Sequence, residues 1–154
     1  MNKVIDKYLN KAVFEASFGI LSGDGGPFGA VITDRNGNII STGHNMVLAT
    51  NDPTNHAEIV AIREASRKLK TFDLSDYILY SSCEPCPMCL SAIIWANIKQ
   101  VYYGADRKDA MQAGFKDNAI YDYLKNNDNN ILNKVKVENE KCVQILKNYR
   151  GERY

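Results

Sequence analysis

The sequence of 154 residues predicts a single α/β domain. Three observations support this fold class. Apolar residues recur every three or four positions near the N-terminus, which is typical of an amphipathic helix. An Asn-Gly pair lies between two short apolar runs and indicates a β-hairpin. In the middle of the chain, a strand-like run, a short apolar helix and another strand-like run form the pattern of a right-handed parallel crossover.

The first half of the chain is predicted to hold two helices and a hairpin. The turn-rich sequence SGDGGP ends the first helix, and DRNGN joins the two strands of the hairpin. Asp52 or Thr54 can cap the second helix. Pro53 is tolerated in the first turn of a helix. The expected elements are a helix at 3–21, strands at 28–33 and 39–42, a loop at 45–51 and a helix that begins near Asp52 or Thr54.

The second half begins with the crossover unit and then becomes harder to interpret. Beyond Gly104 the periodicity weakens, and the polar run NNDNN is typical of a linker or an exposed turn. The expected elements are a strand at 76–81, a helix at 85–96, a strand at 100–103, short helices, an edge strand at 134–138 and a last helix at 141–150.

Composition excludes several classes of protein. Hydrophobic residues make up 45% of the chain and charged residues 24%, which is globular rather than disordered. The formal net charge of +1 argues against a large nucleic-acid surface. No apolar signal-peptide core lies near the start, and no run approaches the ~20 apolar residues of a membrane helix. We expect a cytoplasmic protein without membrane contact, whose cysteines stay reduced.

Three of the four cysteines lie close together in the sequence SSCEPCPMCL, residues 81–90. Cys86 and Cys89 stand three residues apart at the start of a predicted helix, so their side chains share one face. The N–H groups and dipole at that helix end favour thiolates over thiols. His56, at the start of the preceding helix, offers a neutral third ligand. Two thiolates and one imidazole predict a zinc site.

Three protein ligands leave a fourth position open, which is typical of catalytic rather than structural zinc. Water in that position loses a proton near neutral pH and becomes zinc-bound hydroxide. Glu58 follows His56 by two residues and is predicted to shuttle a proton from this water to a substrate nitrogen, if the helix end points into the pocket. His-x-Glu followed by Pro-Cys-x-x-Cys is the signature of zinc-dependent base deaminases.

Four further residues have structural interpretations. Cys83 is interpreted as a buried or pocket-lining thiol, with a third sulfur ligand as the alternative. Cys142 is expected in the core on the last helix. His44 is interpreted as a surface or loop histidine rather than a ligand. Trp95 is expected in the core or at a dimer interface, with the pocket lining as the alternative.

Several stretches carry a family resemblance: GGPFGAVI, NDPTNHAE, SCEPCPMC, DAMQAGF and the terminal ERY. On these the chain resembles the cytidine-deaminase-fold superfamily and, within it, the small bacterial guanine deaminases. The resemblance implies one domain over residues 1–154, a three-layer α/β/α sandwich with a central mixed five-stranded sheet, and one zinc ion per subunit. It also implies a homodimer in which the C-terminal segment, about 127–154, exchanges between subunits.

The same resemblance implies roles around a purine base. Asn45 matches a residue that hydrogen-bonds the base, and Phe28 one that packs on it. Asp117 matches an acidic residue that helps to move protons, and Tyr154 a terminal tyrosine that closes over the pocket. Each residue also has a structural alternative. Asn45 could be a turn residue and Phe28 a core residue. Asp117 could cap the following helix, and Tyr154 could belong to a frayed terminus. Asn55 departs from the family pattern, in which alanine is common.

The predicted activity is hydrolysis of guanine to xanthine and ammonia. The alternatives within the same chemistry are guanosine, another purine, an aminotriazine or tRNA adenosine, although a tRNA enzyme should carry a basic surface. A different class, a zinc-stabilised binding module, has no use for an acid such as Glu58 beside an open ligand position.

Overall fold

The computed structural model describes residues 2–154. By internal contacts the chain divides into two units, one that ends at Asn118 and one that spans Ala119–Tyr154. Among the described residues, no helix has both the length and the apolar character that a membrane crossing needs.

In chain order the elements are α1 (Lys3–Ser22), β1 (Gly29–Thr33), β2 (Ile39–His44), α2 (Val47–Thr50), α3 (Ala57–Leu69), β3 (Ile78–Cys83), α4 (Pro87–Trp95), β4 (Gln100–Ala105), α5 (Arg107–Gln112), α6 (Asp117–Asn126) and α7 (Glu140–Asn148).

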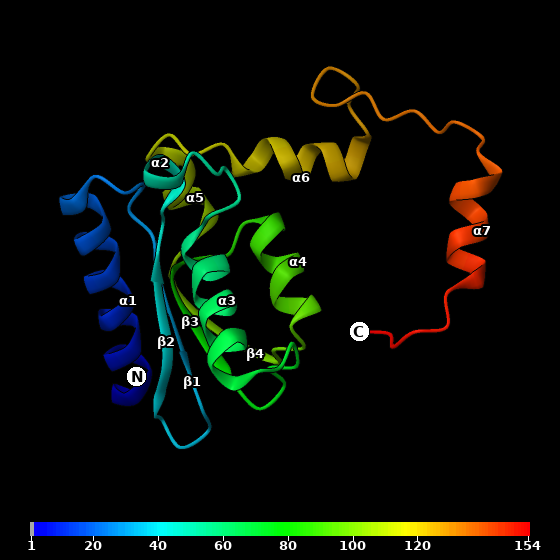
Figure 1. The fold of residues 1–154 in the computed structure, drawn as a ribbon. Helices are drawn as coiled ribbons and strands as arrows, with labels where there is room; N and C mark the ends of the chain where they lie inside the picture. Colours follow the sequence, from blue (N-terminus) through cyan, green and yellow to red (C-terminus); the bar gives the residue numbers. More distant parts are fainter. Residues whose placement is uncertain (1) are drawn as a thin grey trace. The chain divides into compact units, whose positions relative to one another are not determined.

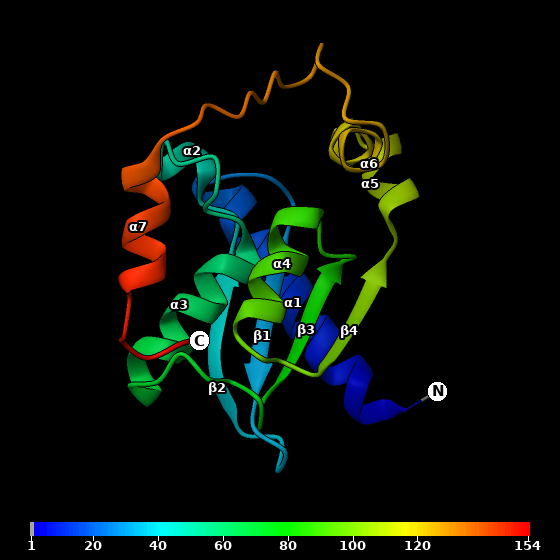
Figure 2. The same ribbon diagram turned by 90° about the vertical axis from the view of Figure 1, so that its right-hand side faces the viewer.

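The first unit is built around a mixed sheet of strand order β2-β1-β3-β4. β1 runs antiparallel to both β2 and β3, whereas β3 and β4 are parallel and joined through α4. Helix α1 covers one face of this sheet, and α3 and α4 cover the other (Figure 1). Figure 2 shows α3 and α4 side by side in front of the strands. The predicted α/β fold with helices on both faces is therefore confirmed.

The core lies on both faces of the sheet. β1 is buried along its whole length because helices cover both of its sides. Small residues let the helices approach closely. A Cβ atom on Gly29 would lie 1.9 Å from the backbone oxygen of Ala12 in α1, so only glycine fits there. The packing between helix and sheet is therefore tight directly beneath the strand ends that carry the pocket.

The prediction of a fifth strand is wrong. Residues 134–138 alternate as a strand would, but they form no strand in the structure, and the sheet has four. A strand needs a neighbouring strand to satisfy its backbone N–H and C=O groups, and the unit Ala119–Tyr154 contains none. Every residue from 129 to 154 is exposed, and this includes Cys142, which was expected in the core.

Two local features also differ from the sequence prediction, apart from shifts of one or two residues at the ends of other elements. The loop expected at 45–51 contains the single helical turn α2. Helix α3 begins at Ala57 rather than near Asp52 or Thr54, and neither of these two residues is its N-cap. The Asp52 carboxylate instead accepts hydrogen bonds from the backbone N and the hydroxyl of Thr54, at 2.8 and 2.6 Å, which closes a turn. That turn places His56 at the N-cap of α3.

Candidate active site

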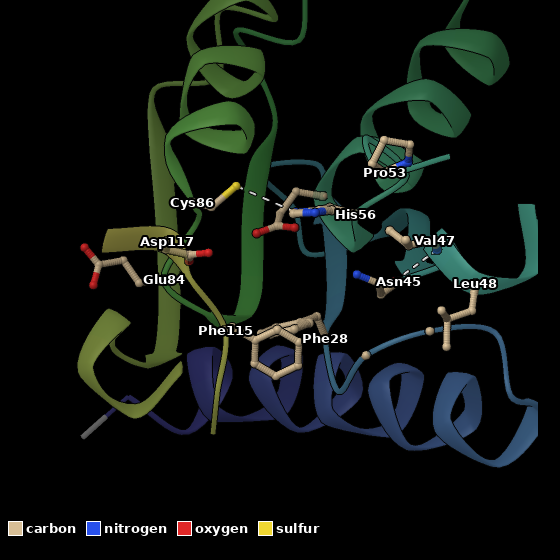
Figure 3. A pocket seen from close by; sticks show the side chains of 13 residues that line it. Phe28, Asn45, Val47, Leu48, Pro53, His56, Glu84, Cys86, Phe115 and Asp117 are labelled. Carbon is tan, nitrogen blue, oxygen red and sulfur yellow. Dashed lines mark hydrogen bonds between the residues drawn. The ribbon is translucent and has the colours of Figure 1, made fainter. Parts of the chain in front are cut away.

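Two helix N-termini converge at the ends of the strands. His56 is the N-cap residue of α3 and Cys86 is the N-cap residue of α4, both with extended backbone. Neither side chain caps its own helix, and Figure 3 shows Cys86 and His56 pointing toward one another. Pro87 at the first position of α4 fixes the start of that helix, so that Cys89 falls one turn later on the same face.

These residues form a cluster with the geometry of a zinc site. The sulfur atoms of Cys86 and Cys89 each lie 3.6 Å from His56 Nδ1, and the ligand atoms of the three residues lie within 4.8 Å of one another. Tetrahedral zinc, with Zn–S bonds of about 2.3 Å and Zn–N bonds of about 2.1 Å, requires an S···N separation of about 3.6 Å. The donor set and its spacing therefore fit one zinc ion.

The charges of the cluster also suit a cation. The pKa of Cys86 is lowered to about 4, first by the hydrogen bond with Cys89 and then, against the effect of burial, by His56. The pKa of Cys89 is raised, first by its hydrogen bond to Cys86. The hydrogen bond with Cys86 raises the pKa of His56. One sulfur is therefore a thiolate already, and the proton on the other would be released as a metal binds.

Glu58 lies beside this cluster, at the second position of α3. Its side chain is buried, with 6% of the residue exposed. Ser81 Oγ lies 3.4 Å from Oε1, and Cys89 Sγ lies 3.4 Å from Oε2. Burial raises the pKa of the Glu58 carboxyl. The N-terminus of α3 points into the pocket, which was the condition for Glu58 to reach the site, and it places this carboxyl group next to a ligand sulfur.

A pocket of about 460 Å³ opens over the cluster. It is large enough for a small organic ligand. Six residues predicted from the sequence line it: Phe28, Asn45, His56, Glu58, Cys86 and Asp117.

Asn45 and Phe28 form parts of the pocket wall. Asn45 is buried, and its Oδ1 accepts a hydrogen bond from the backbone N of Val47 at 3.1 Å. Because that N–H needs an acceptor, the amide NH₂ of Asn45 remains as the donor toward a ligand. The Phe28 ring meets the Phe115 ring edge-on, with centroids 4.7 Å apart (Figure 3).

Asp117 begins α6 and lines the same pocket. Its pKa is raised, first by burial and then by the negative charge of Cys86. The pocket therefore holds a second carboxyl group with enhanced proton affinity, in addition to Glu58. Tyr154 lies at the end of the unit Ala119–Tyr154, so its role at the pocket stays a prediction.

The structural interpretations of the remaining residues have mixed outcomes. Cys83 is a buried thiol outside the metal cluster, as expected, and burial raises its pKa to about 11. His44 is not a ligand, but it is half-buried rather than on the surface, and its Nε2 lies 2.8 Å from Asp24 Oδ2. Trp95 is 64% exposed and does not line the pocket, so the core position is wrong, and the alternative of a dimer interface stays a prediction.

Sequence reasoning missed several residues of the pocket. Glu84 and Phe115 both line it, and both stand inside the stretches SCEPCPMC and DAMQAGF that carry the resemblance. The Glu84 carboxylate accepts a hydrogen bond from the backbone N of Arg107 at 2.9 Å, which ties the cysteine loop to the start of α5. Leu48 lines the pocket from α2, a helix too short to leave a periodic signal.

A second cavity of about 300 Å³ lies behind the aromatic pair. Phe28 and Phe115 line both cavities, so their rings form a shared wall. Residues of α1 and α5, including Ile20 and Ala110, line the far side, together with the buried thiol of Cys83.

Comparison with known proteins agrees with this geometry. The family described as "Cytidine and deoxycytidylate deaminase zinc-binding region" matches residues 2–105. The guanine deaminase of Bacillus subtilis (strain 168) is 53% identical over 116 residues, which cover 75% of this chain and 74% of that protein. The crystal structure of a guanine deaminase from Bacillus subtilis superposes with a TM-score of 0.87 and 42% identity, covering 100% of this chain and 99% of the other.

More distant relatives include tRNA-specific adenosine deaminases. A tRNA-specific adenosine deaminase of Buchnera aphidicola is 37% identical over 123 residues, or 80% of this chain and 79% of that protein. The matched residues 2–105 include all three members of the metal cluster and Glu58. The chain therefore belongs to the cytidine and deoxycytidylate deaminase family of zinc-dependent deaminases.

Proposed function

We propose that this protein is a guanine deaminase that converts guanine and water into xanthine and ammonia with one zinc ion. The observation that carries the proposal is the cluster of His56, Cys86 and Cys89 beside the buried Glu58, at a pocket of about 460 Å³ that has room for a purine base. Similarity to the Bacillus subtilis guanine deaminase extends over the whole chain, which favours guanine over other amine substrates.

Zinc held by the cluster supplies Lewis acidity, which lowers the pKa of water near carbon 2 of the base. Glu58 accepts the proton of this water while the C2–O bond forms, and it delivers that proton to a ring nitrogen. It then carries the second proton of the water to the exocyclic amine, so that the C2–N bond breaks and ammonia leaves. Guanine and water become xanthine and ammonia, with no net proton gained or lost.

The surroundings of Glu58 suit this shuttle. Ser81 and Cys89 contact one carboxylate oxygen each, at 3.4 Å, and so fix the orientation of the group. Burial raises the pKa of the carboxyl group, which favours its protonated form between the two transfers. Asp117, whose pKa is also raised by burial, would stabilise the protonated amine as it departs.

Recognition of the base would depend on Asn45 and Phe28. The Asn45 oxygen already accepts a hydrogen bond from Val47 N, whereas its NH₂ group remains a donor toward the pocket. This donor would pair with an acceptor of the base, and guanine offers a carbonyl oxygen and ring nitrogens. The Phe28 ring would pack on the base and is supported by Phe115.

A substrate panel tests the proposed function. Zinc-loaded protein should release equimolar xanthine and ammonia from guanine, and much less ammonia from guanosine, an aminotriazine or a tRNA that carries the target adenosine. Ammonia release and chromatography of the base measure this. Protein that deaminates tRNA adenosine and never forms xanthine would leave the zinc chemistry in place but overturn guanine as the substrate.

We also propose a cytoplasmic homodimer in which residues of about 127–154 exchange between subunits. All four cysteines are free thiols, and the thiolate ligands need a reducing compartment, which cell fractionation would test. The unit Ala119–Tyr154 leaves large apolar side chains exposed, including Leu132, Val135, Val137, Ile145 and Leu146. A second subunit would bury this surface and receive Tyr154 at its pocket.

Mixing two defective variants tests this exchange. Glu58→Gln subunits keep Tyr154, and Tyr154→Ala subunits keep Glu58. If the tail serves the partner's pocket, a heterodimer of the two has one complete site, so random assembly should recover about a quarter of wild-type activity. Co-expressed variants that stay as inactive as each one alone, despite forming heterodimers, would contradict the exchange.

A further inference from the structure

His44 makes a partly buried polar contact next to the pocket without lining it. It ends β2 directly before Asn45. Its Nε2 lies 2.8 Å from Asp24 Oδ2, and its Nδ1 lies 4.0 Å from Glu15 Oε2. Only 14% of the His44 side chain and 22% of the Asp24 side chain are exposed. A hydrogen bond that is largely shielded from water is stronger than the same bond in water.

Asp24 joins three elements at one point. Its carboxylate meets His44 at the end of β2, and its backbone N donates a hydrogen bond to the Gly19 oxygen of α1 at 2.9 Å. Its backbone oxygen accepts hydrogen bonds from Leu48 N and Ala49 N, both at 3.0 Å, at the start of α2. The position of Asp24 therefore sets the position of α2.

Asp24 and its neighbour Gly25 are in direct contact with residues of the pocket wall. Gly25, the next residue, lies so close to Asn45 that a Cβ atom there would be 2.1 Å from Asn45 Oδ1. Leu48, whose N–H is held by Asp24, lines the pocket as well. A displacement of Asp24 would consequently move Asn45 and Leu48, which Figure 3 shows on the same side of the pocket.

The imidazole itself is fixed from the side of α1. A Cβ atom on Gly19 would lie 2.7 Å from His44 Cδ2, so the ring packs directly on the helix backbone. The Phe18 ring meets it edge-on at 5.6 Å. Glu15, which faces Nδ1, is itself paired with Lys11 at 2.9 Å. These contacts hold the ring in the orientation in which Nε2 faces Asp24.

We propose that His44 is a positioning residue for substrate binding. By holding Asp24, it fixes the loop at Gly25 and the start of α2, so that Asn45 and Leu48 are in place before the base arrives. This inference rests on the proposed guanine deaminase function. His44 touches neither the base nor the metal cluster, so its contribution is to the affinity for substrate rather than to the chemical step.

Two substitutions at His44 separate the contact from the packing. His44→Phe keeps a flat ring but removes the hydrogen bond, and it should raise KM for guanine about tenfold with kcat and zinc content unchanged. His44→Gln retains a donor at the reach of Nε2, and it should restore KM to within about threefold of wild type. Arg67→Gln, which breaks an exposed ion pair with Glu64, is the matched control.

Two further readouts show whether the effect passes through the proposed contacts. In an Asn45→Ala background, His44→Phe should change KM by less than about twofold, because the two residues then act through one interaction. Hydrogen exchange at the amides of Leu48 and Ala49 should be faster in His44→Phe, with exchange in β1 and β3 unchanged.

The outcomes distinguish this inference from the proposed function. Wild-type protein that turns over guanine, with KM and amide exchange unaltered by His44→Phe, overturns the positioning role. A His44→Phe variant with lower kcat or zinc content and a constant KM overturns it as well. If wild-type protein forms no xanthine but exchange at Leu48 and Ala49 still accelerates in the variant, the substrate claim fails and the positioning contact stands.

Discussion

Replacing Glu58 by Gln is expected to lower kcat about a thousandfold or more while the protein keeps its zinc and its fold. Gln has the shape of Glu and can still accept the contact from Ser81, but it cannot carry a proton. Both proton transfers of the proposed reaction depend on this one carboxyl group, so the substitution slows both the formation of the C2–O bond and the loss of ammonia. KM should change little, because Glu58 acts on the reacting atoms.

The measurement needs kcat from xanthine formation, zinc by elemental analysis and the melting temperature of each variant. Glu64→Gln is the matched control, since it makes the same chemical change on the same helix at a site that faces Arg67 and solvent. Glu58→Gln that loses zinc would show a structural role instead. Turnover near the wild-type rate in the zinc-loaded variant would refute the proton shuttle.

Replacing Cys89 by Ala is expected to remove zinc and with it all measurable turnover. The cluster has three protein ligands, and the loss of one leaves two, which do not hold zinc at ordinary concentrations. The melting temperature of wild-type protein should rise on addition of zinc, because binding to the folded state alone stabilises it. That rise should vanish in Cys89→Ala.

Cys83→Ala provides a matched comparison. Cys83 is also a buried cysteine of the same stretch, but it lies outside the cluster and its sulfur contacts the backbone oxygen of Asp106 at 3.7 Å. This variant should retain one zinc ion per chain and most of the activity. Equal zinc loss in both variants would mean that the three-ligand assignment is wrong and that Cys83 belongs to the metal site.

Much of the site could be predicted because its residues obey local rules. The Cys86–Cys89 spacing is a property of a single helical turn, and the structure reproduces it, although α4 begins at Pro87 rather than at Pro85. His56 Nδ1 lies 3.6 Å from both sulfurs because α3 packs beside α4. The Cys86–Cys89 spacing says nothing about this packing, whereas the pairing of His-x-Glu with Pro-Cys-x-x-Cys implies it. The convergence was predicted from the combination of motifs.

Other parts depend on partners that no local pattern specifies. The alternation at residues 134–138 is compatible with a strand, but a strand also needs a neighbour, and the unit that contains it provides none. Helix α3 starts after the turn at Asp52 because a short side chain-to-backbone bond competes with helix capping. The contact of His44 with Asp24 joins residues 20 apart and left no motif.

The wall formed by Phe28 and Phe115 also bears on how the selectivity of the enzyme could change. One pair of rings separates the pocket over the metal cluster from a second cavity lined by Ile20 and Ala110. Substitutions in that rear space can tilt the rings and so reshape the room for a base, while every ligand and proton carrier stays in place. Substitutions in the second cavity could thus let the pocket accept new substrates, without disturbing the reaction centre.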